Sequence, residues 1–89
     1  MKSKTTELFW KLYANLPVLI KKQARDVFKC FQEDPFYPSL YFKRVHSSRP
    51  IFSIRISKSY RAVGVLQENE IIWFWIGSHS EYDKLLKQM

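Results

Sequence analysis

The sequence predicts an α+β domain in which two N-terminal helices pack on one face of a three- to four-stranded antiparallel sheet and a short helix ends the chain. Apolar residues recur at three- and four-residue spacing as far as Asp34 and at two-residue spacing after Pro38, so helices precede strands. A chain of 89 residues can bury only one hydrophobic core, and we therefore expect residues 1–89 to form a single domain.

Two helical patterns fill the first third of the chain. The apolar residues of the first pattern lie at helical spacing, and they are Leu8, Phe9, Leu12, Tyr13 and Leu16. Thr5 or Thr6 can cap this helix, and Pro17 marks a corner because proline is favoured at the first position of a new helix. The second helix is expected to run to about Asp34 and to bury one stripe, Ile20, Ala24, Val27, Phe28 and Phe31.

Four stretches after Pro38 are predicted to be strands, and they span residues 40–45, 51–57, 60–66 and 71–76. In the second stretch apolar residues alternate with polar ones, which leaves Arg55 on the face away from the helices. The last stretch is apolar on both faces and should lie inside the sheet, because an exposed edge of this kind would aggregate. Residues 77–83 are expected to form a loop and residues 84–89 a short helix, so that the second sheet face stays free for a ligand.

The formal charge of +7 is concentrated in one segment. No carboxylate occurs between Asp34 and Glu68, and this segment contains His46 and six cationic residues, Lys43, Arg44, Arg49, Arg55, Lys58 and Arg61. A clustered positive field attracts a phosphate backbone, so a polyanionic partner such as RNA is expected. General attraction of RNA is assigned to Lys43, Arg44, His46, Arg49 and Lys58.

Several function classes lack their characteristic residues in this chain. Gly64 and Gly77 are the only glycines, so there is no glycine-rich phosphate loop, and no histidine or cysteine motif has metal-ligand spacing. We therefore expect neither a metal ion nor a small-molecule cofactor. Cys30 is the only cysteine, which excludes an internal disulfide and favours a reduced cytoplasm. No apolar run predicts a signal peptide or a membrane span.

Four residues are candidates for metal-free RNA cleavage. Arg55 and Arg61 lie on neighbouring predicted strands, whereas His79 and Tyr82 follow the end of the last strand. Attack by a ribose 2′-hydroxyl on its own phosphate needs a base, an acid and cations, which histidine and arginine side chains supply. Structural interpretations exist as well. The arginines could be exposed strand cations, His79 a structural polar residue, and Tyr82 an anchor for the C-terminal tail.

The chain resembles toxins of the RelE/ParE superfamily, which belong to bacterial type II toxin–antitoxin pairs. Their C-terminal half is similar to residues 52–65, Phe-Ser-Ile-Arg-Ile-Ser-Lys-Ser-Tyr-Arg-Ala-Val-Gly-Val, and to residues 71–85, Ile-Ile-Trp-Phe-Trp-Ile-Gly-Ser-His-Ser-Glu-Tyr-Asp-Lys-Leu. The most specific pieces are Tyr60-Arg61 and Gly-Ser-His followed by Glu-Tyr-Asp. Upstream, Leu-Pro, Asp-Pro and Ser-Leu-Tyr-Phe-Lys-Arg-Val also fit, so the resemblance covers nearly the whole chain.

The RelE-like branch of this superfamily consists of mRNA interferases that usually cut messages on the ribosome. By this resemblance, Arg61 matches the strand arginine that stabilises the transition state, Arg55 the basic residue of the preceding strand, and His79 the histidine of the final loop in several members. Our hypothesis is that His79 acts as the general acid. Tyr82 or His46 is expected near the position of the base. The partners that the resemblance implies are a cognate acidic antitoxin, mRNA and the ribosome.

Two other functions stay open at this point. Toxins of the ParE branch poison DNA gyrase and lack the nuclease residues, so His79 and Tyr82 favour the nuclease. A non-catalytic module would use the basic face only to hold RNA or an acidic partner. Two positions depart from RelE proper, because Ser53 stands in place of a lysine and His79 in place of a basic residue of the final loop.

Overall fold

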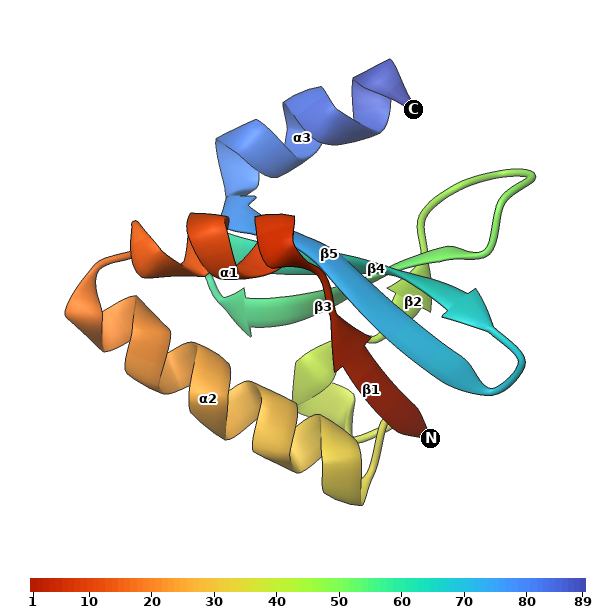
Figure 1. Cartoon of the computed structure of the whole chain (residues 1–89), viewed down its shortest axis with the longest axis horizontal. Coiled ribbons are helices and arrows are strands. Elements are labelled where there is room, and N and C mark those ends of the chain that lie inside the picture. Colours follow the sequence, from red (N-terminus) through yellow and green to blue (C-terminus); the bar gives the residue numbers. More distant parts are fainter.

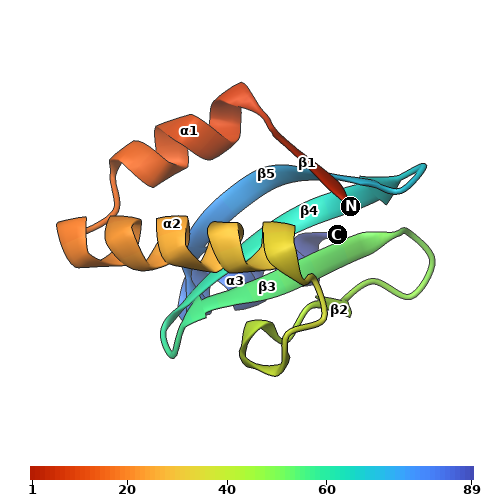
Figure 2. The ribbon, with the colours of Figure 1, turned by 90° about the horizontal axis from the view of Figure 1, so that it is seen from below.

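A mixed sheet of five strands forms the centre of the molecule, and the computed structural model describes residues 1–89. The strands lie in the order β1-β5-β4-β3-β2 (Figure 1), and they are β1 (Lys2–Thr5), β2 (Lys43–Arg44), β3 (Ile51–Ser57), β4 (Tyr60–Gln67) and β5 (Glu70–Ser78). The helices are α1 (Glu7–Ala14), α2 (Val18–Glu33), the 3₁₀ turn η1 (Pro38–Leu40) and α3 (His79–Gln88). Figure 2 shows α1 and α2 on one face of the sheet and α3 on the other, which confirms the α+β class.

The two N-terminal helices lie where the sequence predicts them. Thr6 caps α1, and its side chain accepts a hydrogen bond of 3.2 Å from a backbone N–H of the first turn. Pro17 directly precedes α2, which ends at Glu33 with Asp34 as its C-cap. None of the helices has the length and the apolar composition needed to cross a membrane. Ala24 and Phe31 are fully buried on the packed face of α2, so the predicted stripe is confirmed.

The sequence pattern does not predict β1. Its four residues, Lys-Ser-Lys-Thr, lack apolar alternation and are all exposed. The backbone pairs in parallel with β5, with Lys2 opposite Glu70 and Thr5 opposite Trp73, and Lys4 Nζ lies 3.5 Å from Glu70 Oε1. β1 therefore forms because β5 offers a free edge for backbone pairing. This parallel pairing makes the sheet mixed instead of wholly antiparallel. β5 lies inside the sheet, as its apolar sequence predicts.

The predicted strand over residues 40–45 is much shorter in the structure. Pro38–Leu40 form η1, and only Lys43–Arg44 pair with β3. Tyr41 separates these two elements because its φ of 48° is left-handed and cannot continue a strand. Pro38, at the start of η1, has a φ that suits a helical turn. The apolar residues that follow it resemble a strand pattern, so this turn was not predicted.

Two tight hairpins set the register of β3, β4 and β5. Glu68 and Asn69 connect β4 to β5 with φ values of 47° and 66°, the signs that a type I′ turn requires. Between β3 and β4 the register places Arg55 opposite Arg61, and a bulge follows directly. Both arginines therefore lie close to the turn that joins their strands.

The face under α1 and α2 carries a core of aromatic side chains. Trp73 of β5 is fully buried, and Phe28 and Phe31 of α2 meet its ring edge-on at centroid distances of 5.2 and 5.3 Å. Ile54 of β3 and Ala62 of β4 are also fully buried on this face. These contacts hold α2 across the strands, as Figure 2 shows.

The last helix begins five residues earlier than the sequence pattern predicts. α3 starts at His79, within the expected loop over residues 77–83, and not at Lys84. Ser78 Oγ accepts a hydrogen bond of 3.3 Å from the Glu81 N–H, and the Glu81 carboxylate accepts one of 3.3 Å from the Ser78 N–H. This reciprocal pair is a capping box, so the spacing Ser-x-x-Glu was the sequence signal for the helix start.

α3 covers part of the sheet face that was expected to be free. Tyr82 is buried between α3 and the sheet, where it packs with Ile51 of β3 and Val63 of β4. Half-buried side chains complete this second cluster, and they include Val45, Phe74, Trp75, Leu85 and Leu86. Only the remainder of this face is open to a ligand.

We expect Gly64→Ala to lower the free energy of unfolding by about 1–3 kcal/mol, because the core has no room for a methyl group there. The added Cβ would lie 2.9 Å from Cε3 of Trp73 and 3.0 Å from the backbone oxygen of Ile72. Urea unfolding measures the change. Gln67→Ala, at the exposed end of the same strand, is the control and should stay within about 0.5 kcal/mol of the parent. Equal stability of the two variants would contradict this packing.

Candidate functional site

Two arginines face each other across β3 and β4, on the sheet face that carries α3. The register places Arg55 directly opposite Arg61, and like charges at opposed positions destabilise a sheet. The ion pairs of the chain join Lys4 to Glu70 and Lys11 to Glu7, and His79 lies against Asp83, so none of these contacts includes Arg55 or Arg61. Because no carboxylate forms an ion pair with either arginine, this arrangement favours a bound anion.

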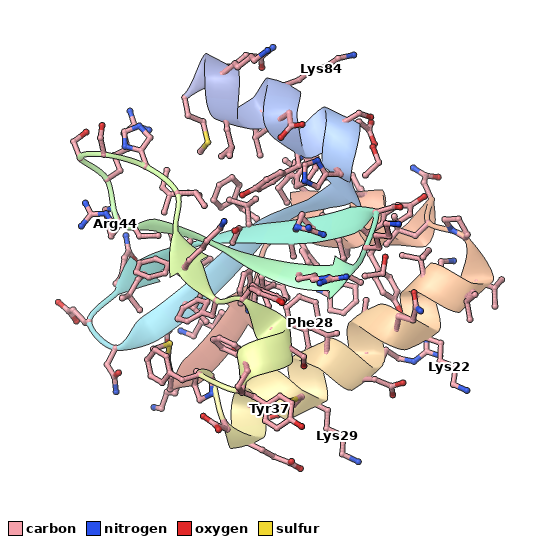
Figure 3. All side chains as sticks on the ribbon, turned by 180° about the vertical axis from the view of Figure 1, so that it is seen from behind. Lys22, Phe28, Lys29, Tyr37, Arg44 and Lys84 are labelled. Atoms are coloured by element: carbon pink, nitrogen blue, oxygen red, sulfur yellow. The ribbon has the colours of Figure 1, made fainter.

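A small cavity of about 130 Å³ lies beside the arginine pair. Three of its five lining residues are cationic and none is acidic, and the five are Tyr41, Lys43, Ser53, Arg55 and Arg61. Figure 3 shows this sheet face between α3, which carries Lys84, and the segment near Tyr37. Arginine holds two phosphate oxygens at once, so the cavity suits a phosphate group.

The largest hollow of the surface is elsewhere and has the wrong charge for a phosphate. It measures about 530 Å³, lies at the β4–β5 turn and is lined by Gln67, Glu68 and Glu70. The two carboxylates there would repel a polyanion. The arginine cavity is the candidate site, although it is smaller, because cations make up three of its five lining residues.

The β3–β4 turn holds the Arg61 guanidinium in place. Nη1 of Arg61 donates hydrogen bonds to the carbonyl oxygens of Ser57 at 2.6 Å and Tyr60 at 2.9 Å. Partial burial lowers the pKa of Arg61, and the charge of Arg55 lowers it further. Tyr82 and Asp83 of α3 act in the opposite direction and raise this pKa. The cation is therefore fixed by the protein before any ligand binds, which is the requirement for electrostatic preorganisation.

Arg55 is positioned by an aromatic ring from outside the sheet. Its Cζ lies 5.4 Å from the ring centroid of Tyr41, within the range of a cation–π interaction. Tyr41 follows η1 and is 58% exposed, whereas Arg55 is half-buried. The contact brings the connection between α2 and β2 to the site.

His79 lies at the first position of α3, next to the turn that carries Arg61. Its backbone N–H donates a hydrogen bond of 2.7 Å to the carbonyl oxygen of Ser59 in that turn. Its Nδ1 lies 3.2 Å from Oδ2 of Asp83, and a carboxylate at one ring nitrogen orients an imidazole. The side chain is half-exposed and Nε2 has no partner within the chain, so the ring can meet a ligand at this edge of the sheet.

The structure gives Tyr82 the anchoring role instead of an open position. It is 6% exposed, and its hydroxyl donates a hydrogen bond of 3.1 Å to Oγ of Ser53. Ser53 lines the cavity on its other side and lies opposite Lys43 in β2. Tyr82 therefore does not line the cavity itself, but its hydroxyl is one hydrogen bond away from a residue that does.

The remaining residues of the predicted RNA-binding set form two groups. Lys43 lines the cavity, and Lys58 lies in the β3–β4 turn. Arg44 donates from Nε to the carbonyl oxygens of His46 at 3.0 Å and Arg49 at 3.1 Å, and Figure 3 shows it beside the loop that follows β2. His46 Nδ1 accepts two backbone N–H bonds of the same loop, the shorter of 2.9 Å from Arg49. These residues order the loop, and His46 does not line the cavity.

Sequence reasoning missed three residues of this site, and the first is Ser53, which lines the cavity. Asp83 follows His79 by four positions, the spacing that brings two side chains together on a helix, but the segment was expected to be a loop. Tyr41 was expected in a strand, and nothing in the local pattern reveals its contact with Arg55. No group of three or more His, Cys, Asp and Glu side chains is placed to hold a metal ion.

The two-helix layer, the mixed sheet and the C-terminal helix on the opposite face together form the RelE-like fold of small toxins. Residues 19–84 match the model of the ParE-like toxin domain, and the chain therefore belongs to this family. A search of curated proteins found no match.

Solved structures of similar fold cover almost the entire chain. The RelB-RelE antitoxin-toxin complex from Methanococcus jannaschii matches with a TM-score of 0.74 and 19% identity, over 91% of this chain and 96% of that one. The YoeB/ParE toxin from Agrobacterium tumefaciens gives 0.69 and 16%, over 89% and 99%. The isolated E. coli RelE toxin gives 0.65 and 15%, over 98% and 96%. At these identities the likeness concerns the fold.

We expect Tyr82→Phe and Ser53→Ala each to lower the free energy of unfolding by about 0.5–1.5 kcal/mol, because each removes one partner of a buried hydrogen bond. The double variant should lose less than the sum of the two single changes, since both remove the same bond. Urea unfolding of the four proteins gives the coupling energy. Strict additivity would show that this bond does not join α3 to β3.

Proposed function

We propose that this chain is the toxin of a type II toxin–antitoxin pair and that it cleaves mRNA on the ribosome, in the cytoplasm and without a metal ion. Membership of the ParE-like toxin domain family supports the toxin assignment. The nuclease assignment rests on Arg55 and Arg61, which have no ion-pair partner, and on His79, whose backbone is bonded to the turn that carries Arg61, because this edge of the sheet then combines two phosphate-binding cations with a proton donor.

The arginines act on the phosphate in this mechanism. The 2′-hydroxyl oxygen attacks the adjacent phosphorus, the O2′–P bond forms and the P–O5′ bond breaks, which leaves a cyclic phosphate and a free 5′-hydroxyl. Arg61 and Arg55 bind the non-bridging oxygens and stabilise the negative charge that grows on them. The turn carbonyls of Ser57 and Tyr60 support this role by holding Arg61 in a fixed position.

His79 acts on the leaving oxygen. Its imidazolium, oriented by Asp83, donates a proton to O5′ as the P–O5′ bond breaks. Tyr82 and His46 were expected near the base, but Tyr82 is buried against Ser53 and His46 orders a loop outside the cavity. The proton of the 2′-hydroxyl therefore passes to solvent in this scheme.

An antitoxin would inhibit the chain by occupying the same charges. The similar protein from Methanococcus jannaschii was solved as an antitoxin-toxin complex, which supports a protein partner of this kind. A segment with acidic and apolar residues that crosses Arg55 and Arg61 would neutralise them and exclude RNA from the cavity.

Inhibition of DNA gyrase is the rival function, since the matching family model is described as ParE-like. A gyrase poison needs no proton donor beside its cations. The contact with Asp83 that orients His79 therefore favours the nuclease over this rival and over a module that only holds RNA.

We expect Arg61→Ala to lower the cleavage rate by about 10²–10³-fold and His79→Ala by about 10²–10⁴-fold, the usual effects of losing a charge-stabilising donor and a general acid. The measurement is the mapping of message ends after incubation with translating ribosomes. Lys22→Ala, on the exposed face of α2, is the control and should cleave normally. Unchanged cleavage by both site variants would contradict the nuclease mechanism. Stalled gyrase complexes without any message cleavage would support the ParE function.

We expect the association rate with the antitoxin to fall by about 10- to 1,000-fold between low and high salt, because the cationic face steers an acidic partner. Stopped-flow mixing at two salt concentrations measures this rate. A rate that does not change with salt would contradict electrostatic steering by Arg55 and Arg61.

A further inference from the structure

The connection between α2 and β2 presents exposed aromatic side chains next to the phosphate cavity. Tyr41 is 58% exposed and is the only aromatic residue that lines the cavity, whose other members are polar or cationic. Phe36 and Tyr37 of the same connection are also exposed but do not line it. A large ring left in water beside three cations has no role in the hydrophobic core.

Two features fix the Tyr41 ring at this place. Arg55 lies against the ring, with its Cζ 5.4 Å from the centroid, so one face of the ring is covered by a guanidinium. The backbone of Tyr41 is left-handed, with φ of 48°, a conformation that is costly for a residue with a bulky side chain. Strain held at a specific position is typical of functional sites.

We propose that Tyr41 is a stacking site for one nucleobase of the RNA strand whose phosphate binds Arg55 and Arg61. The proposal rests on the nuclease function proposed above and deepens it. A phosphate held by Arg55 lies within one nucleotide of the ring, because the guanidinium itself contacts that ring. Bases stack on aromatic rings in single-stranded RNA recognition, and arginine beside the ring adds a cation–π contribution.

Stacking on Tyr41 would add what the arginines lack. A phosphate cradle holds every nucleotide equally and cannot decide how the strand is rotated about its phosphate. A base on the exposed face of the Tyr41 ring fixes that rotation and holds the neighbouring ribose relative to the arginines. The 2′-hydroxyl is then presented to the bound phosphorus in one orientation, which is the geometric condition for in-line attack.

The test measures binding and does not depend on cleavage. A short, fluorescently labelled, 2′-O-methylated RNA cannot be cut by 2′-hydroxyl attack, and a matched oligonucleotide of the same length carries abasic sites. Affinities of both for the parent protein and for Tyr41→Leu are measured by fluorescence anisotropy at one fixed salt concentration, since phosphate contacts depend on salt. Leu at this position keeps an apolar side chain that is not branched at Cβ but removes the ring.

Tyr41→Leu should weaken binding of the base-carrying oligonucleotide by about 5- to 150-fold and leave the abasic one unchanged, as expected for the loss of one stacked base. Tyr41→Phe keeps the ring and should bind like the parent. Tyr37→Leu, the same kind of change on an exposed ring outside the cavity, is the matched control and should also bind like the parent.

Equal affinity of Tyr41→Leu and the parent for the base-carrying RNA would overturn the stacking site. So would an equal loss for both oligonucleotides, or no binding of either by the parent. A protein that shows the Tyr41 effect but never cuts messages on ribosomes would keep the stacking site and lose the nuclease function. Cleavage of messages without a Tyr41 effect on binding would keep the nuclease function and remove the stacking site.

Discussion

The opposition of Arg55 and Arg61 across β3 and β4 is the constraint on which the site depends. Two guanidinium groups at opposed positions repel each other, and the sheet register leaves them no other arrangement. Backbone carbonyls of the turn hold one guanidinium and the Tyr41 ring holds the other. The two groups therefore still repel each other in the folded protein, and this repulsion favours the binding of an anion. A phosphate bound between the two guanidinium groups would reduce the repulsion.

α3 determines how much of the sheet face that anion can reach. Tyr82 seals the apolar part of the face, and its hydrogen bond to Ser53 joins the helix to the floor of the cavity. The backbone bond from His79 to Ser59 ties the start of the helix to the turn that holds Arg61. The same helix thus covers the hydrophobic surface, leaves the charged end open and places an imidazole at its border.

The sequence predicts the parts of this molecule that depend on periodic patterns and local signals. The two N-terminal helices, the position of β5 and the cross-strand placement of Arg55 and Arg61 follow from spacing and from the need to bury apolar residues. β1 could not be predicted, because it is held by backbone pairing and not by its side chains. The start of α3 carried a local signal, the Ser78–Glu81 capping box, which alternation and turn composition obscured. The burial of Tyr82 depends on long-range packing that no local pattern contains.

The residues at the cavity determine what kind of selectivity the site can have. Its cations meet phosphate oxygens, which are the same in every nucleotide, and an aromatic ring accepts the face of any base. Reading a base requires donors and acceptors aimed at its edges, and the uncharged polar groups of the lining are only the hydroxyls of Tyr41 and Ser53, the second of which accepts a hydrogen bond from Tyr82. Under the nuclease function proposed above, such a site would hold and orient a strand more than it would select a sequence. A preference for particular codons would then come from the partner that presents the message, which is the physical reason to propose that cleavage depends on the ribosome.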